Sequence, residues 1–127
     1  MTIVGIGIDA TDIPRVRETY QKYGERFLRR VLTDAEMAYC LRRRDPVPHI
    51  AGRFAAKEAG MKAIGTGHSH GVLWRDVEVV RDAGGPPHLR FHGAAARHSA
   101  ALGATRTLLT ITHSESLAFA QVILVSD

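Results

Sequence analysis

The sequence AGRFAAKEAGMKAIGTG, residues 51–67, predicts a long helix followed by a tight loop. Alanine and unbranched side chains dominate its first part, and these residues favour helices. Phe54, Met61 and Ile64 supply an apolar stripe, which indicates a face that packs on a core. The helix then meets Gly65-Thr66-Gly67, where a glycine just past the last turn can take the left-handed conformation that closes a helix. Such a loop also lets backbone amides approach an anion closely.

The charged residues of this helix form two rows. Glu58 and Lys62 stand four residues apart and share a face, and Arg53 and Lys57 form a second row with the same spacing. One interpretation is an ordinary surface helix with exposed ion pairs, which contribute little energy. The other is a phosphate-binding face. Glycine inside a helix lowers helix stability by about 1 kcal/mol relative to alanine. Gly60 could instead mark close packing against another backbone.

Length and composition predict one soluble globular domain spanning residues 1–127. The chain is long enough for a core but too short for two domains, and it is 45% apolar and 24% charged. Cys40 is the single cysteine, which excludes an internal disulfide and fits a reducing compartment. The sequence has neither a signal peptide pattern nor an apolar run that would span a bilayer. We therefore predict a cytoplasmic protein.

Positive charge is concentrated in one third of the chain. Residues 15–44 hold nine basic and four acidic side chains, a net +5, whereas the whole chain carries +4. Such a patch attracts an acidic partner, which is a protein, a nucleic acid or a membrane surface. For any single arginine, a solvated helix face is the simpler interpretation.

The order of predicted elements favours an α+β fold. Thr33 and Glu36 form a capping-box pattern at the start of one helix. Alternating and β-branched segments predict strands, and alanine-rich or amphipathic segments predict helices. The predicted strands are 2–9, 73–80, 88–92, 105–112 and 116–125, and the predicted helices are 13–22, 27–32, the stretch after Thr33, 51–64 and 93–102. They interleave without the regular spacing of a doubly wound fold.

The first strand, TIVGIGID at residues 2–9, carries the strongest candidate ligand. Gly5 and Gly7 leave one of its faces bare, which permits close approach of another backbone or of a ligand. Asp12 is the better helix cap because Pro14 suits a first turn, so Asp9 has no evident structural role. Asp9 and Glu58 together match the one or two carboxylates through which Mg²⁺ binds proteins and phosphates.

The remaining chemistry centres on His113, in TITHSES between two predicted strands. This histidine is a candidate general base or anion ligand. The sequence has no zinc-type spacing, no GxSxG elbow and no complete dinucleotide fingerprint. A zinc enzyme, a serine hydrolase and a Rossmann oxidoreductase are therefore disfavoured.

Three stretches together resemble the holo-[acyl-carrier-protein] synthase family, the short type of 4'-phosphopantetheinyl transferase. They are GIGIDATDIPR at 5–15, RFAAKEAGMKAIGTG at 53–67 and TITHSESLAFAQV at 110–122. The second stretch is quite specific, whereas the others are weak alone. Leu117 departs from the family, which often has tyrosine there. The resemblance implies transfer of 4'-phosphopantetheine from coenzyme A to a serine of apo acyl carrier protein, giving the holo protein and adenosine 3',5'-bisphosphate, in the context of fatty acid biosynthesis.

The resemblance also implies the fold, the assembly and the site residues. It implies a mostly antiparallel sheet packed against a long central helix, in a homotrimer with active sites at the subunit interfaces. It assigns the metal ligands (Asp9, Glu58), the catalytic residues (Glu58, Lys62, His113), the coenzyme-binding residues (Arg53, Lys57, Gly65, Thr66, Gly67, His113, Ser114) and the carrier-binding residues (Arg15, Lys22). For the general base, Glu58 is the first candidate and His113 the second.

Two other functions fit parts of the sequence. The basic segment suggests a nucleic-acid-binding module, but aromatic residues make up only 6% of the chain and no recognised motif accompanies them. Asp9 and Glu58 also fit a different magnesium-dependent phosphotransferase or phosphodiesterase. The resemblance favours the transferase, without nucleic acid or membrane as a partner.

Overall fold

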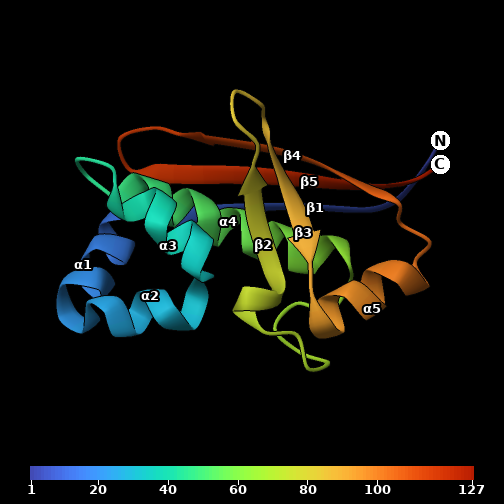
Figure 1. Cartoon of the computed structure of the whole chain (residues 1–127), viewed down its shortest axis with the longest axis horizontal. Coiled ribbons are helices and arrows are strands. Elements are labelled where there is room, and N and C mark those ends of the chain that lie inside the picture. Colours follow the sequence, from blue (N-terminus) through green and yellow to red (C-terminus); the bar gives the residue numbers. More distant parts are fainter.

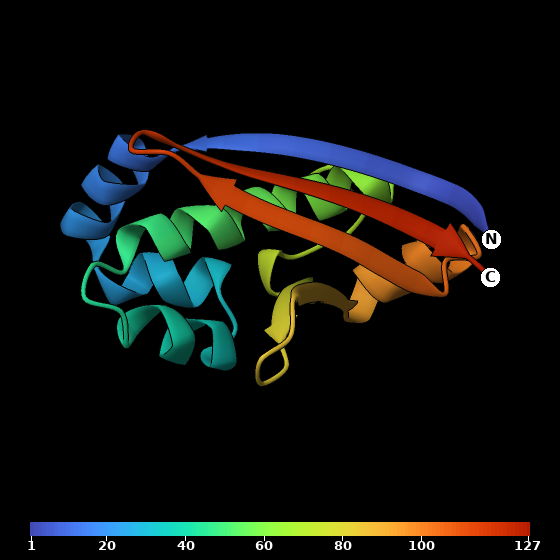
Figure 2. The ribbon, with the colours of Figure 1, turned by 90° about the horizontal axis from the view of Figure 1, so that it is seen from above.

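Three long antiparallel strands and one long helix form the frame of the fold (Figures 1 and 2). The computed structural model describes all residues 1–127. Strands β1 (Thr2–Asp12), β5 (Leu117–Ser126) and β4 (Arg106–His113) pair in the order β1-β5-β4. Helix α4 (Val47–Ala63) lies against one face of this sheet, so the predicted central helix and the α+β class are confirmed.

The other elements cover the side of α4 that faces away from the sheet. Three short helices gather at one end of the molecule, and a two-stranded hairpin crosses near its middle (Figure 1). These elements are α1 (Ile13–Tyr23), α2 (Glu25–Val31), α3 (Asp34–Leu41), the 3₁₀ turn η1 (Trp74–Asp76), β2 (Val77–Arg81), β3 (Pro87–Phe91) and α5 (Gly93–Ala101). None of the helices combines the length and the apolar character that crossing a membrane requires.

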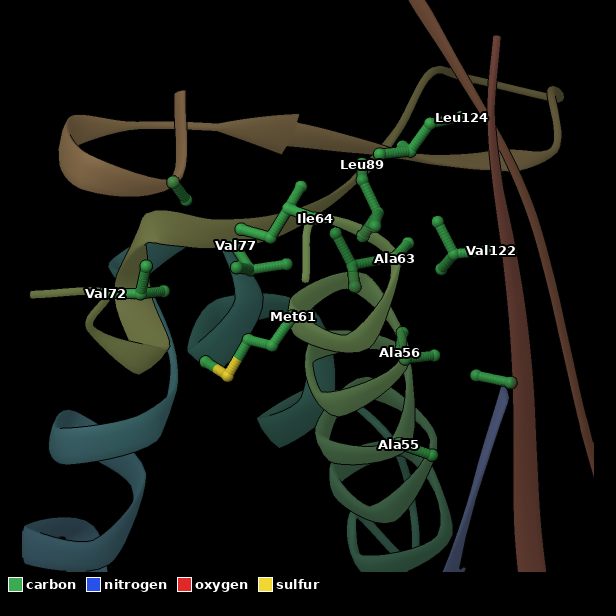
Figure 3. Close-up of a cluster of buried hydrophobic side chains, with 14 of the residues drawn as sticks. Ala55, Ala56, Met61, Ala63, Ile64, Val72, Val77, Leu89, Val122 and Leu124 are labelled. Carbon is green, nitrogen blue, oxygen red and sulfur yellow. The ribbon is translucent and has the colours of Figure 1, made fainter. Parts of the chain in front are cut away.

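Helix α4 is buried on two sides because its side chains are small. In the cluster of Figure 3, Val122 and Leu124 of β5 pack on one side of the helix, and Val77 and Leu89 of the hairpin pack on the other. Residues such as Ala56 between them are completely buried. The helix therefore forms the centre of the core, which explains its alanine-rich sequence.

Glycines let the helix approach β1 closely. A Cβ atom on Gly5 or Gly7 would overlap the carbonyl oxygens of Ala63 or Ala59, so the bare strand face predicted above accommodates a backbone. Gly60 faces the hairpin, where a Cβ atom would crowd Val77 and Leu89. The glycine inside the helix thus marks close packing, although against side chains.

A bulge near the N-terminus sets the register of β1. Ile3 pairs with Val125 whereas Gly5 pairs with Leu124, so Val4 is the additional residue. Beyond the bulge, successive side chains alternate between the two faces of the sheet. Asp9 and the two glycines then lie on the helix side.

The opposite face of the sheet is apolar and uncovered. It displays Ile6 and Ile8 of β1, Leu108 of β4 and Phe119 of β5, all of them exposed. Ile6 lies opposite Ile123 of β5, which in turn lies opposite Leu108. Contiguous apolar surface of this kind marks an interaction site in soluble proteins.

One helix start was predicted correctly, and one strand start was not. The capping box is confirmed, because Glu36 N donates to Thr33 Oγ1 at 3.3 Å and Thr33 N donates to Glu36 Oε1 at 2.8 Å. The strand predicted from Leu73 begins only at Val77. Asp76 folds the preceding residues into a 3₁₀ turn, since its Oδ2 accepts a 3.0 Å hydrogen bond from Leu73 N.

Candidate active site

Asp9, Glu58 and Lys62 meet where the end of β1 crosses α4. Lys62 Nζ lies 2.8 Å from Asp9 Oδ1 and 3.0 Å from the Ile8 carbonyl oxygen, to which it donates hydrogen bonds. Glu58 lies one turn earlier on the helix and interacts directly with Asp9. Two elements that are distant in the sequence therefore bring together two carboxylates and an ammonium group.

The local sequence explains this meeting. Gly5 and Gly7 bring α4 against β1, so the Lys62 side chain of the helix reaches Asp9 and the Ile8 carbonyl oxygen of the strand. Asp9 follows the glycines with the same two-residue alternation and therefore points at the helix. Glu58 and Lys62 stand four residues apart, which places both of them over β1.

Burial and the neighbouring Asp9 perturb Glu58. Burial, a hydrogen bond with Asp9 and the negative charge of Asp9 raise the pKa of Glu58 from 4.5 to about 7, and Lys62 opposes this rise. The hydrogen bond with Asp9, together with the charges of both carboxylates, raises the pKa of Lys62, although burial opposes this. A carboxyl group with a pKa near neutrality is suited to accept and release protons.

A cavity of about 360 Å³ opens beside these carboxylates. Asp9 and Glu58 line it together with Arg15 of α1 and the ring of Phe54. Thr11 also lines it, and its buried hydroxyl oxygen has no hydrogen-bond partner in the chain. The cavity thus combines an acidic wall, a basic residue and an unsatisfied polar atom, which suits a charged substrate.

The donor set fits a hard divalent cation. No group of three or more histidine, cysteine, aspartate or glutamate side chains is arranged to hold a metal ion. Mg²⁺ does not require such a cage, since it often uses one or two carboxylates plus water and phosphate oxygens. Asp9 and Glu58 supply these two carboxylates, and their mutual repulsion, evident in the pKa of Glu58, is what a bound cation would relieve.

The Gly65–Gly67 loop closes the far end of α4 as predicted. Gly65 has φ of 82° and Gly67 has φ of 54°, both in the left-handed region. The amides of Thr66 and Gly67 donate to the Met61 carbonyl oxygen at 3.1 and 3.2 Å. Thr66 is buried, whereas Gly65 is exposed and its Cα faces open space. A ligand is therefore able to lie along this loop.

Arg53 and His113 line a different cavity, of about 330 Å³. His49 of the first turn of α4 also lines this cavity, and its ring centroid lies 6.4 Å from that of His113. Burial, followed by the charges of Arg43 and Arg53, lowers the pKa of His49. The structure does not bring His113 into the cavity of Asp9 and Glu58.

Ser114 lies in the exposed turn between β4 and β5. Its hydroxyl oxygen accepts a 3.3 Å hydrogen bond from Leu117 N, and its amide donates to the Leu117 carbonyl oxygen at 2.8 Å. The Ser116 carbonyl oxygen accepts a 2.9 Å bond from Ile13 N, which anchors this turn to the start of α1. Ser114 therefore holds the turn that carries His113.

Lys57 requires a correction. It was predicted to contact the coenzyme from an exposed polar row, but its side chain is completely buried. Its Nζ donates to Glu36 Oε1 at 2.7 Å and to the carbonyl oxygens of Trp74 and Val77 at 3.2 and 2.7 Å. All of its donors are used inside the core, so Lys57 is unable to contact a phosphate directly.

Sequence reasoning overlooked three residues of the second cavity. Tyr39, His49 and Arg81 line it beside Arg53. His49 stands four residues before Arg53, a helical spacing that was visible in the sequence. Tyr39 and Arg81 come from α3 and β2, and no local pattern links them to the helix.

The comparisons with known proteins agree with this geometry. The family whose sequence model matches residues 5–120 is described as the 4'-phosphopantetheinyl transferase superfamily. The holo-[acyl-carrier-protein] synthase of Koribacter versatilis is 49% identical over 122 residues, which cover 96% of this chain and 98% of that protein. The crystal structure of the Neisseria meningitidis synthase superposes with a TM-score of 0.88 at 33% identity, covering 98% of this chain and 100% of the other.

A second solved structure contains a nucleotide. The Bacillus anthracis synthase in complex with CoA (3',5'-ADP) superposes with a TM-score of 0.81 at 36% identity, and the match covers 100% of both chains. The sequence matches, the superpositions and the Asp9–Glu58–Lys62 geometry all support the resemblance drawn from the three motifs. The chain belongs to the 4'-phosphopantetheinyl transferase superfamily and, within it, to the holo-[acyl-carrier-protein] synthases.

Proposed function

We propose that the chain performs the reaction of this family at the junction of β1 and α4. It transfers the 4'-phosphopantetheine group from coenzyme A to a serine of apo acyl carrier protein and leaves adenosine 3',5'-bisphosphate. The observation that carries the proposal is the meeting of Asp9, Glu58 and Lys62 beside an open cavity. Phosphoryl transfer depends mainly on positioning and charge neutralisation, which these side chains provide.

Asp9 and Glu58 are the residues that would hold Mg²⁺. The bound ion would neutralise charge on the pyrophosphate of the coenzyme. Lys62, exposed on the same face, contributes a positive charge beside the transferred phosphate. A serine nucleophile must lose its proton, and Glu58, which lines the same cavity, is the first candidate to accept it.

The residues assigned to the coenzyme lie in two separate places on one copy of the chain. Gly65, Thr66 and Gly67 border the end of α4 beyond Lys62, whereas Arg53 and His113 line the second cavity with Ser114 in the adjoining turn. We assign the glycine loop to the pantetheine pyrophosphate region. We assign Arg53, His113 and Ser114 to the adenosine 3'-phosphate and the base.

A homotrimer accounts for this division. The uncovered apolar face of the β1-β5-β4 sheet provides a surface for a second copy of the chain. Contact through this face would let the Arg53–His113 cavity of one copy serve the Asp9–Glu58 cavity of another. The trimeric number itself comes from the family resemblance.

The acidic carrier protein approaches from α1. Arg15 lines the cavity of Asp9 and Glu58, and Lys22 lies exposed near the other end of the same helix. Neither residue forms an ion pair within the chain. Both remain free for carboxylates of the partner, where complementary charge speeds association and fixes orientation.

A cytoplasmic location belongs to the same proposal. Cys40 is a free thiol, and burial raises its pKa to about 11. An unreactive buried thiol is compatible with the reducing compartment predicted from the sequence.

The test is intact-mass analysis of apo acyl carrier protein incubated with the chain, coenzyme A and Mg²⁺. A gain of one phosphopantetheine, lost when a chelator is present, supports both the reaction and the metal requirement. An unchanged mass, when an established synthase modifies the same carrier, rejects the proposal. Release of phosphopantetheine without carrier would instead indicate a phosphodiesterase.

A further inference from the structure

The ring of Tyr39 contacts arginines from three different segments. The guanidinium carbon of Arg53 on α4 lies 3.9 Å from the ring centroid, and that of Arg43, in the loop before α4, lies 4.3 Å from it. Arg81 of β2 donates a 3.3 Å hydrogen bond from Nη1 to the Tyr39 hydroxyl. Tyr39 is therefore the common neighbour of three cationic side chains.

These arginines have no carboxylate partner. No ion pair in the chain includes Arg43, Arg53 or Arg81. Arg53 is only 6% exposed, and its Nε has no hydrogen-bond partner. A buried guanidinium nitrogen left unsatisfied is costly, which indicates that a ligand or solvent completes its hydrogen bonding.

The cavity beside Tyr39 is strongly basic. Its 12 lining residues include Arg53, Arg81, His49 and His113, and none is acidic. A neighbouring cavity of about 250 Å³ also touches Tyr39 and Arg53 and does contain glutamates. Glu36 of that cavity is paired with Lys57. Glu78 is hydrogen-bonded to Thr33 and His92. The acid-free cavity is therefore the better binding site for a dianion.

An aromatic ring orients a guanidinium group without neutralising it. A carboxylate in the same place would fix Arg53 but would also consume its charge and its donors. The face of a tyrosine ring attracts the cation through its quadrupole and leaves the planar N–H donors free for a phosphate. Holding the arginine in advance also reduces the conformational entropy lost when a ligand binds.

We propose that Tyr39 is a positioning residue, which holds Arg53 so that it binds the phosphate monoester on the ribose 3' oxygen of the coenzyme donor. Tyr39 thereby sets the preference of the enzyme for a 3'-phosphorylated donor over the same donor without that phosphate. This inference rests on the proposed function and assigns one of its recognition steps to a residue outside the three family motifs.

The test compares coenzyme A with 3'-dephospho-coenzyme A at saturating carrier protein and Mg²⁺. For Tyr39→Leu we expect the KM for coenzyme A to rise about tenfold, with kcat and the KM for the dephospho donor nearly unchanged. Tyr39→Phe retains the ring and should keep most of the preference. Tyr23→Leu replaces an exposed tyrosine of α1 that lies outside this cavity. Its ring contacts Lys22, which is assigned to the carrier, so at saturating carrier the KM for each donor should stay unchanged.

Equal increases of KM for both donors, or none, would overturn the inference. If circular dichroism shows that Tyr39→Leu does not fold, Tyr39→Met is used in the same comparison. It retains side-chain volume and also lacks the ring. A separate calorimetric arm measures binding of adenosine 3',5'-bisphosphate and of 5'-AMP to the protein without carrier. The inference fails if Tyr39→Leu weakens both nucleotides equally, whereas absence of transfer by the unsubstituted protein rejects only the proposed reaction.

Discussion

Lys57 and Glu36 form an ion pair in which both side chains are completely buried, with Lys57 Nζ 2.7 Å from Glu36 Oε1. Lys57 also donates to the carbonyl oxygens of Trp74 and Val77, and Glu36 Oε2 accepts a 2.9 Å hydrogen bond from Val79 N. Burial lowers the pKa of Lys57, although Glu36 opposes this. The pair joins α3, α4 and β2 in the interior of the molecule.

Removing one partner of this pair should strongly destabilise the fold. Lys57→Met leaves the Glu36 carboxylate buried without its cation, and we expect a loss of about 3–5 kcal/mol in the free energy of unfolding. Urea unfolding at neutral pH measures it. Arg29→Met is the matched control, since Arg29 and Glu25 form an exposed pair on α2. That control should cost less than about 0.5 kcal/mol, and a similar small cost for Lys57→Met would contradict the prediction.

The two carboxylates of the active site should be needed for transfer but not for folding. We expect Asp9→Asn and Glu58→Gln each to lower kcat on the order of 10²-fold or more, because each removes charge that supports the transition state. The intact-mass assay measures the loss, and circular dichroism checks the fold. Full activity in either variant would remove that residue from the proposed metal site.

The stability of the metal-free protein should fall as pH rises. The pKa of Glu58 is raised from 4.5 to about 7 in the folded state, so between these values the folded chain holds a proton that the unfolded chain has lost. Stability therefore decreases across this window and levels off above about pH 7. The measurement is the melting temperature as a function of pH, in chelator, for the unsubstituted protein and for Glu58→Gln. The difference between the two curves is the contribution of Glu58. Parallel curves for the two proteins would contradict it.

Charge on the outer face of the sheet should separate the subunits. Phe119→Glu or Leu108→Glu would place a carboxylate within the proposed interface, where burial without a partner is costly. Sedimentation velocity should show a smaller species and the mass assay should show lost transfer. Leu73→Glu is the control, because Leu73 is 65% exposed and lies outside the sheet.

Mixing inactive variants tests whether the active site is shared. Asp9→Asn damages one cavity and Arg53→Ala damages the other. Co-refolded mixtures should regain part of the transfer activity, because some interfaces then combine two intact cavities. No recovery from a properly assembled mixture would show that each copy works alone.

Reversing Arg15 should weaken recognition of the carrier. We expect Arg15→Glu to raise the KM for apo carrier about tenfold while changing kcat less, as for a residue that makes uniform binding contacts. Arg97→Glu makes the same charge change on an exposed position of α5 and is the control. An unchanged carrier KM for Arg15→Glu would move the docking surface away from α1.

The sequence predicted features that depend on neighbouring residues. The Thr33–Glu36 capping box and the left-handed Gly65 are decided within a few residues of chain, and both are present. Gly5 and Gly7 indicated a close approach, although the strand alone left open whether a backbone or a ligand fills the space.

Long-range partners were the source of the errors. Lys57 has the spacing of a surface residue, but Glu36 and two carbonyl oxygens from beyond α4 enclose it. Tyr39 gained its neighbours in the same way, since they come from a loop, a helix and a strand. Periodicity reports which residues share a helix face, but it does not report what covers that face.

The bulge at Val4 fixes which side chains of β1 point to each face of the sheet. Beyond it, odd-numbered residues face the helix and even-numbered residues face the uncovered side, so Asp9 stands between the outward-facing Ile8 and Ala10. Shifting the register of β1 by one residue would turn Asp9 toward the proposed subunit interface and Ile8 into the active-site cavity. Insertions or deletions of a single residue between Gly5 and Asp9 would therefore damage chemistry and assembly together.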